Sequence, residues 1–190
     1  MTSSDTGAGQ QQNGARPISD ATEAGLVTVR LLGLPLQVQA RAQEHSDELV
    51  RELTLVGEQM RQQGNHGDLP ARLVTLVEQL TAEYSAFTGD QEQAIADASA
   101  AGRPTVDITY RIPPSTSAAA RALEDILDEA DEYCRAGKHL LTLPTPPDLV
   151  TYRHWFLDQF VGQIAGAEPV SWADYLERAS ADQSAASTRP

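Results

Sequence analysis

The sequence predicts a mostly helical α+β fold, an antiparallel helical bundle that carries a small two-stranded antiparallel β-ribbon. Two segments, 26–34 and 105–112, alternate apolar and polar residues with the period of a half-buried strand. Each is followed by proline and then by long stretches whose apolar residues recur every three or four positions, the period of an amphipathic helix. The order strand, helix, helix therefore occurs twice, and two antiparallel helices between the strands return the second strand antiparallel to the first.

Local start and stop signals set the expected ends of each element. Gly33 and Pro35 end the first strand, because neither residue suits a strand interior. Ser115 or Ser117 is expected to cap the helix after the second strand, and Asp148 to cap the last helix. In order, the expected elements are a strand at 26–34, a helix at 36–63, a turn at 64–68, a helix at 69–87, a shorter helix at 90–101, a strand at 105–112, a helix at about 118–135, a Pro-rich connection at 140–147 and a helix at 148–164.

The two ends of the chain differ in composition from its centre. Residues 1–24 are rich in Ser, Thr, Gly and Gln and lack apolar periodicity, which predicts a disordered tail. Residues 179–190 show the same character and are also expected to be a disordered tail. Residues 25–166 are expected to form a single folded domain of ordinary size, and the aromatic residues of 167–178 to dock against it as a short tail.

The charge of the chain limits its partners. A formal net charge of −13 repels nucleic-acid phosphates and anionic membrane surfaces, so neither nucleic acid nor membrane is expected as a partner. A positively charged face on another protein is favoured instead. The single cysteine excludes an intramolecular disulfide framework, and no stretch resembles a signal peptide or a membrane span. The chain is therefore expected to be cytoplasmic.

His45 is the first candidate for chemistry, because it lies on the apolar stripe of its helix with Glu44 and Glu48 beside it. A histidine near carboxylates can bind metal or transfer a proton. A metal site needs three or four convergent ligands, and this spacing matches no known ligand set. The favoured interpretation is a partly buried histidine that hydrogen-bonds a neighbouring carboxylate. No phosphate-binding Gly loop or nucleophile motif is present either, so no catalytic residue, metal or cofactor is predicted.

The helix at 118–135 carries an acidic run from Glu124 to Glu132. Calcium loops need a glycine at the bend and alternating ligands, whereas the carboxylates of a helix fan around its axis. The run is therefore interpreted as a solvated face or as an electrostatic docking surface for a basic partner. Asp128 and Glu132 are its candidate contact residues.

The last predicted helix holds the densest aromatic stretch of the chain, YRHWF at 152–156. Most of these rings should lie in the core. Helical spacing directs Trp155 away from the stripe of Tyr152 and Phe156, so Trp155 either packs on a second surface or is exposed. Because Trp and Arg are favoured interface anchors, Trp155 and Arg153 are candidate contact residues.

Two stretches, LLGLPLQVQARAQEHSDELVREL and ALEDILDEADEYCRAGKHLLTLPTPPDLVTYRHWFLDQFVGQI, resemble a family of uncharacterised actinobacterial proteins. Its members look associated with partner-switching stress systems, which contain anti-sigma kinases and their antagonists. The resemblance implies a regulatory accessory role and, as possible partners, such a kinase or its antagonist. It does not imply ATP binding, because the Asn-containing helix and Gly-rich loops of those kinases are missing from this sequence.

Together these observations predict a non-enzymatic regulatory module that acts through protein–protein contacts in bacterial stress or sigma-factor signalling. A homodimer is also expected, since the free edges of a two-stranded ribbon invite pairing. The alternative is a small-molecule sensor, with a pocket between ribbon and bundle near His45 and Tyr110.

Overall fold

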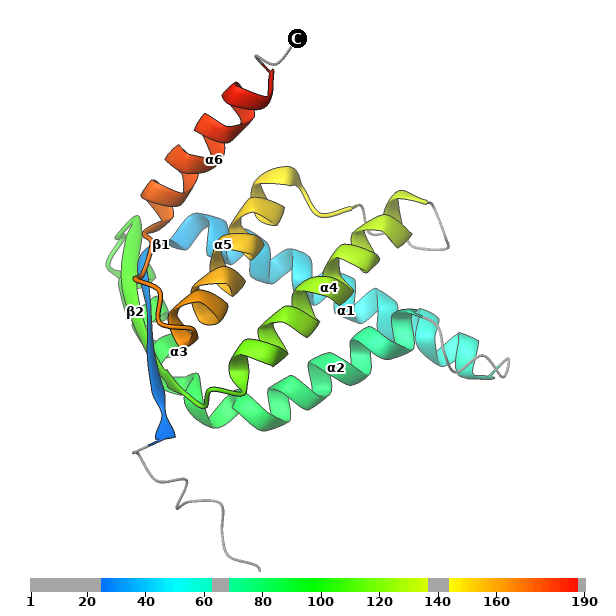
Figure 1. Cartoon of the computed structure of the whole chain (residues 1–190). Coiled ribbons are helices and arrows are strands. Elements are labelled where there is room, and N and C mark those ends of the chain that lie inside the picture. The colour runs from blue at the N-terminus through cyan, green and yellow to red at the C-terminus, as the bar shows by residue number, and fades with distance from the viewer. Residues whose placement is uncertain (1–24, 63–68, 137–143, 188–190) are drawn as a thin grey trace, which may run out of the picture.

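The computed structural model describes residues 25–62, 69–136 and 144–187, and it confirms the predicted mostly helical α+β fold (Figure 1). These ranges hold one two-stranded antiparallel ribbon, six α-helices and one short 3-10 helix. In chain order the elements are β1 (Val27–Pro35), α1 (Leu36–Gln62), α2 (Leu69–Tyr84), η3 (Ser85–Phe87), α3 (Gly89–Ala100), β2 (Thr105–Ile112), α4 (Thr116–Arg135), α5 (Pro147–Ile164) and α6 (Trp172–Ser187).

The ribbon has one buried and one exposed face, as the alternation of its residues predicts. Leu31 lies opposite Ile108, and both side chains are buried. The register then shifts between Leu31 and Leu34. Gly33 takes a positive φ of 66° in this bulge, a conformation that glycine adopts without strain. The N–H of Gly33 donates to Oδ1 of Asp107 at 2.7 Å, which ties the bulge to β2.

Glutamine side chains cover both edges of the ribbon at the same level. Arg30 of β1 lies opposite Thr109 of β2. On the β1 edge, Gln163 of α5 accepts from the N–H of Arg30 at 2.9 Å and donates to its carbonyl at 2.8 Å. On the β2 edge, Gln91 of α3 donates to the carbonyl of Thr109 at 2.6 Å. At Arg30 both backbone groups that a second copy of the ribbon would use are therefore already bonded, and at Thr109 the carbonyl is.

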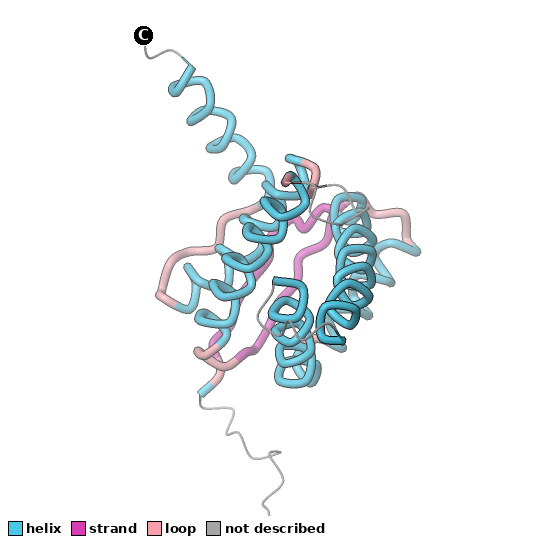
Figure 2. The backbone as a smooth tube through the Cα atoms, turned by 90° about the vertical axis from the view of Figure 1, so that its right-hand side faces the viewer, coloured by secondary structure: helices cyan, strands magenta, loops and turns pink. Residues whose placement is uncertain are grey.

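Helices α1, α2, α4 and α5 lie on one side of the ribbon, as the two perpendicular views agree (Figures 1 and 2). Helix α5 contacts β1, α1 and α4, and thus occupies the centre of the molecule. The main core cluster lies where the ribbon meets α5, and its largest side chains are those of Tyr110, Tyr152, Trp155 and Phe160.

A second core cluster joins the ends of α1, α2 and α4 away from the ribbon. Its buried members are Leu49, Leu53, Leu73, Ile126 and Ala130. These residues recur at helical spacing on their own helices, so each helix presents one apolar stripe to the other two.

Most predicted boundaries differ from the structure by a few residues at helix ends. The predicted helix at 69–87 divides into α2 and η3. Pro146 occupies the N-cap position of α5, and Pro147 begins the helix. The prediction that Asp148 caps this helix is wrong, because proline already supplies the fixed φ of the first turn. Asp148 instead accepts from Arg41 of α1 at 2.7 Å. The predicted turn at 64–68 lies outside the described residues, as does the first half of the predicted connection, at 140–143.

The C-terminal region is more ordered than its composition predicts. Helix α6 continues to Ser187 and so extends into the range 179–190 that was expected to be a disordered tail. Ser171 caps the start of α6, since its hydroxyl accepts from the N–H of Asp174 at 3.1 Å and donates to the Asp174 carboxylate at 2.7 Å. Figure 1 shows α6 projecting away from the bundle. The predicted tail at 1–24 and residues 188–190 lie outside the described residues.

Candidate functional site

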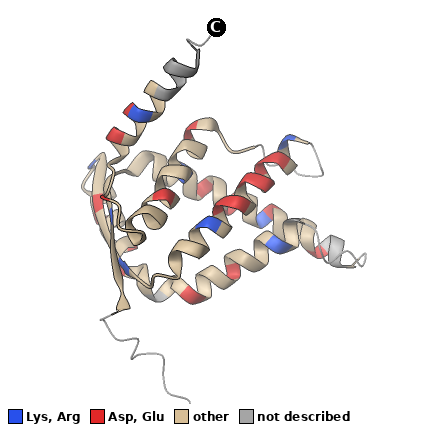
Figure 3. Cartoon of the chain, in the orientation of Figure 1, with Lys and Arg blue, Asp and Glu red and all other residues tan. Residues whose placement is uncertain are grey.

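A stripe of four exposed carboxylates runs along α4. Asp125, Asp128, Glu129 and Glu132 follow one another at steps of three, one and three residues, which places them on a single helix face. Figure 3 shows that acidic residues occur along the length of α4. Asp128 and Glu132, the contact residues predicted from the sequence, are both in this stripe, which we call the acidic stripe.

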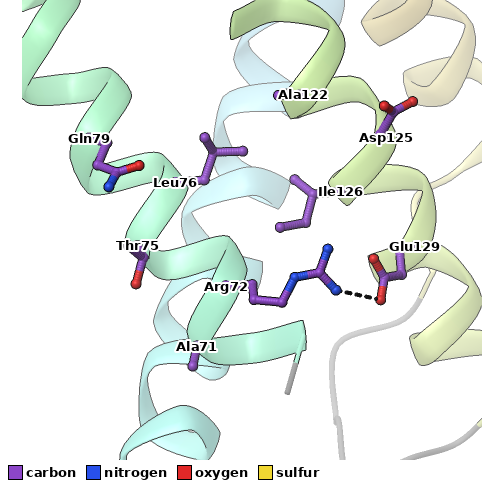
Figure 4. A pocket seen from close by; sticks show the side chains of 9 residues that line it. All are labelled: Ala71, Arg72, Thr75, Leu76, Gln79, Ala122, Asp125, Ile126 and Glu129. Carbon is purple, nitrogen blue, oxygen red and sulfur yellow. Dashed lines mark hydrogen bonds and ion pairs between the residues drawn. The ribbon is translucent and has the colours of Figure 1, made fainter. Parts of the chain in front are cut away.

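A groove lies beside the acidic stripe, between α2 and α4. Its volume is about 510 Å³. Figure 4 shows its residues: Ala71, Arg72, Thr75, Leu76 and Gln79 come from α2, and Ala122, Asp125, Ile126 and Glu129 come from α4. Leu76 and Ile126 give it an apolar floor, and Asp125 and Glu129 form its rim on α4. Sequence reasoning missed this groove, because nothing in the pattern of α2 indicates which helix it faces.

One ion pair crosses the groove. Nη1 of Arg72 lies 3.0 Å from Oε1 of Glu129, and about half of each side chain is exposed. Exposed pairs of this kind contribute little to stability. Two other acids of the stripe, Asp125 in the groove and Glu132 beyond it, form no ion pair with the residues that the structure describes. The acidic stripe therefore keeps two carboxylates without an ion pair in the described part of the chain, one of them beside the apolar floor.

Behind the acidic stripe, a buried charge network fixes α5 to α4. Asp131 is only 3% exposed. Its Oδ1 accepts from the N–H of Thr145 at 2.9 Å, and its Oδ2 accepts from Nη2 of Arg153 at 2.9 Å. Nη2 of Arg153 also lies 2.6 Å from Oδ1 of Asp128. Burial alone would raise the pKa of Asp131, but the hydrogen bonds from Thr145 and Arg153 outweigh burial and lower that pKa.

This network changes the interpretation of Arg153, which was predicted as an interface anchor. Its side chain is 12% exposed and bonds to two carboxylates of its own chain. A partner could therefore reach Arg153 only by breaking bonds that hold the fold together. The role that the geometry supports for Arg153 is to position α4.

Trp155 is fully buried, so the prediction that it marks an exposed protein contact is wrong. It packs on a second surface, which was the other interpretation of its helical position. Its ring lies 5.4 Å from that of Trp172, and its Nε1 donates to the carbonyl of Val170 at 2.9 Å. Oε1 of Gln159 accepts from the N–H of Val170 at 2.9 Å. Trp155 thus anchors the segment that leads into α6.

His45 and Tyr110, which were expected to line one pocket, line two different pockets. His45 lies with Gln39, Tyr152 and Arg153 in a pocket of about 290 Å³ between α1, α4 and α5. Its Nε2 is 3.1 Å from the hydroxyl of Thr145, so the expected bond to a neighbouring carboxylate is replaced by one to a threonine. The hydroxyl of Tyr152 donates to Oε1 of Gln39 in the same pocket.

Tyr110 lies instead under the ribbon, in an apolar pocket between β2 and the bundle. Glu44 and Glu48, the remaining candidate residues, are exposed on α1. They line neither of these pockets.

A smaller cluster of titratable groups lies where α4 and α5 meet. Nε2 of His154 is 3.6 Å from Oδ1 of Asp128 and 4.0 Å from Oε1 of Glu124. Burial, and then the charge of Asp158, raises the pKa of Glu124, and burial also raises the pKa of Asp158. Among the described residues, no three metal-ligating side chains are arranged to hold a metal ion.

Comparison with known proteins adds no family assignment. No protein-family model matches the chain, and no curated protein and no solved structure is significantly similar to it. No helix in the described part of the chain has the length and apolar character needed to cross a membrane.

Proposed function

We propose that the protein is a non-enzymatic regulatory module that binds another protein along the acidic stripe and in the groove between α2 and α4. The observation that carries the proposal is the line of exposed carboxylates beside an apolar floor made by Leu76 and Ile126. An amphipathic helix binds such a groove with its apolar face on the floor and its charged flank toward the rim. Charge complementarity requires that this flank be basic.

The partner that fits is therefore a helix with Lys or Arg on one flank and apolar residues at helical spacing. The sequence resemblance suggests where such a partner belongs: a cytoplasmic stress or sigma-factor signalling system, with an anti-sigma kinase or its antagonist as the bound regulator. The expected homodimer stays a separate proposal. Pairing through the ribbon edges is disfavoured at Arg30 and Thr109, since glutamine side chains already bond both positions.

The first step of the test is to identify the partner. Chemical cross-linking in the native host under stress, followed by mass spectrometry, should recover one regulator joined to α4 or α2. Its affinity for the purified full chain is then measured by calorimetry at several salt concentrations. Affinity should fall as salt rises, because salt screens exposed charges. Recovery of metabolic enzymes alone, or of nothing under any stress, contradicts the proposal.

Charge reversal then locates the surface. The double variant Asp125→Lys/Glu132→Lys should weaken binding at least about tenfold, because two attractive contacts become repulsive. The matched control is Glu44→Lys/Glu48→Lys, which makes the same charge change on α1. That control should leave the affinity within about twofold of the unmodified chain. Equal losses for the two variants, or a loss for the control alone, would show that the partner binds elsewhere.

A second candidate function is supported by a different observation. The pocket beneath β2, lined by Tyr110, lies between the ribbon and the bundle, where a small-molecule sensor would bind its signal. His45 does not line this pocket. If the protein is a sensor, the residues that line the pocket with Tyr110, and not His45, select its ligand.

A further inference from the structure

The pocket beneath β2 is walled almost entirely by carbon. It has a volume of about 270 Å³ and is formed by α2, η3, β2, α4 and α5 together. Phe87, Phe156 and Phe160 supply aromatic surface, and Leu80 and Leu123 supply aliphatic surface. A cavity of about 150 Å³ with such walls stays dry and binds benzene. This pocket therefore has room for a substituted aromatic ring.

The space exists because of small residues on α4. Ala119 and Ala120 line the pocket in the first turns of this helix, opposite Leu80 and Tyr84 of α2. Larger side chains at these positions would fill it. At the neighbouring helix ends, the hydroxyls of Tyr84 and Ser115 lie 3.4 Å apart and bridge α2 to α4.

One fully buried polar atom at this pocket has no hydrogen-bond partner among the described residues. The hydroxyl oxygen of Thr116, a residue of the lining, is buried and makes no hydrogen bond with any residue that the structure describes. Leaving a buried hydroxyl unbonded costs free energy comparable to a lost hydrogen bond. Threonine populates two rotamers in helices, so rotation about χ1 can turn this hydroxyl toward a ligand.

The surroundings favour an uncharged ligand. No Lys, Arg, Asp or Glu lines the pocket. Burial, and then the negative charge of Glu92, raises the pKa of Tyr110 to about 12. A carboxylate placed beside Tyr110 would meet the same two penalties, and no cation in the walls would offset them.

We propose that this pocket binds a small uncharged apolar molecule with one hydroxyl or carbonyl group, about the size of a substituted phenol, whose polar group hydrogen-bonds to Thr116. The proposal rests on the second candidate function above and is independent of the acidic stripe. It names the chemical class of the signal that the sensor would bind.

Three probes of one shape test the chemical class: p-cresol, which has a hydroxyl, toluene, which lacks it, and p-toluate, which carries a charge. Each is titrated into the full chain and followed by calorimetry and by the rise in melting temperature, which reports occupancy. We expect saturable binding with p-cresol tightest, toluene about fivefold weaker for want of one hydrogen bond, and p-toluate without binding.

Two variants place the ligand. Thr116→Val removes the hydroxyl but keeps the shape of the side chain. The affinity for p-cresol should therefore fall about fivefold, while the affinity for toluene stays unchanged. Ala119→Leu fills the pocket with a good helix former and should abolish binding of both probes. Circular dichroism checks that each variant keeps its helical content. If Ala119→Leu does not fold, nuclear Overhauser contacts between p-cresol and the ring of Phe156 in the unmodified chain replace it.

Each outcome is decisive. Absence of saturable binding for all three probes overturns both the ligand and the sensor function, while the docking function on α4 is untouched. Tighter binding of p-toluate than of p-cresol overturns the uncharged class but leaves a sensor. Binding that persists in a folded Ala119→Leu variant shows that the probes bind at another place, and this also overturns the proposal.

Discussion

Asp131 is the residue on which the arrangement of α4 and α5 most depends. Its two carboxylate oxygens bond to Thr145, which lies in the connection before α5, and to Arg153 within α5. Removing one partner of a buried, hydrogen-bonded ion pair leaves the other charge uncompensated, which costs about 3 kcal/mol or more. The carboxylate therefore does more for the fold than the half-exposed ion pair between Arg72 and Glu129.

The lowered pKa of Asp131 predicts a pH dependence of stability. A carboxyl group whose pKa is lower in the folded than in the unfolded state stabilises the fold when ionised. This contribution is complete above the unfolded pKa of about 3.9 and is lost as pH falls through the folded value. Urea unfolding at a series of pH values should show a steeper fall of stability below about pH 4 for the unmodified chain than for Asp131→Asn.

Asp128→Asn is the control for this measurement, because Asp128 is about half exposed. It should keep most of the acid dependence. If Asp131→Asn and the unmodified chain lose stability in parallel, then Asp131 does not carry the effect.

Residue roles were the hardest part to predict from the sequence. Asp131 was placed with the other acids on the solvent face, although it falls four residues after Leu127 and three before Cys134, on the inward stripe. That spacing indicated a buried position, but the prediction followed the charge of the side chain instead. For Trp155, helical spacing correctly allowed packing on a second surface, but only the folded chain shows that this surface is formed by Trp172.

At the scale of elements, the ribbon is protected by side chains rather than by further strands. A two-stranded ribbon is marginally stable alone, and its edges are prone to pair with other chains. Gln163 bonds both backbone groups of Arg30 and so occupies the place of a neighbouring strand. The expectation of dimerisation through the ribbon came from its strand count, which says nothing about helices that lie along its edges.

Removing this cover should have two effects. Gln163→Ala loses two hydrogen bonds to β1, which predicts a stability decrease of about 1–2 kcal/mol in urea unfolding. It also frees the edge of β1, so sedimentation velocity should show association that rises with protein concentration. Gln37→Ala, an exposed glutamine on α1, is the control and should change neither property. A variant at 163 that stays as stable and as monodisperse as the control would contradict this role.

The sequence predicted where the strands and helices lie along the chain better than it predicted which of them pack against each other. Period and breakers placed both strands and the long helices within a few residues, because these signals are local. The groove between α2 and α4 and the pocket under β2 depend on which helix faces which. That pairing is set by tertiary packing, so Tyr110 and His45 could not be separated by sequence spacing alone.

The whole molecule has a large excess of negative charge. A formal net charge of −13 keeps such a protein soluble but destabilises the compact state through self-repulsion. Several of these carboxylates are exposed on α1 and α4, where salt can screen them.

Salt should therefore stabilise this protein. Raising NaCl from about 0.1 to about 1 M shortens the Debye length from about 10 Å to about 3 Å. If this relieves about 1 kcal/mol of repulsion, calorimetry should record a rise in melting temperature of about 3 °C. The variant Asp125→Lys/Glu132→Lys, with less negative charge, should respond less. A melting temperature that falls with added salt would mean that attractive pairs outweigh the repulsion.

Gln159 links the segment before α6 to the side chain that covers the edge of β1, two parts of the chain that also contact each other directly. Its single side-chain oxygen accepts from Val170, just before α6, and from Gln163, which covers the edge of β1, at 3.2 Å. Tension applied to the protruding C-terminal helix is therefore transmitted through two amide groups to the first strand. A ligand or protein that pulled on this helix would therefore strain the hydrogen bonds that shield the edge of the first strand.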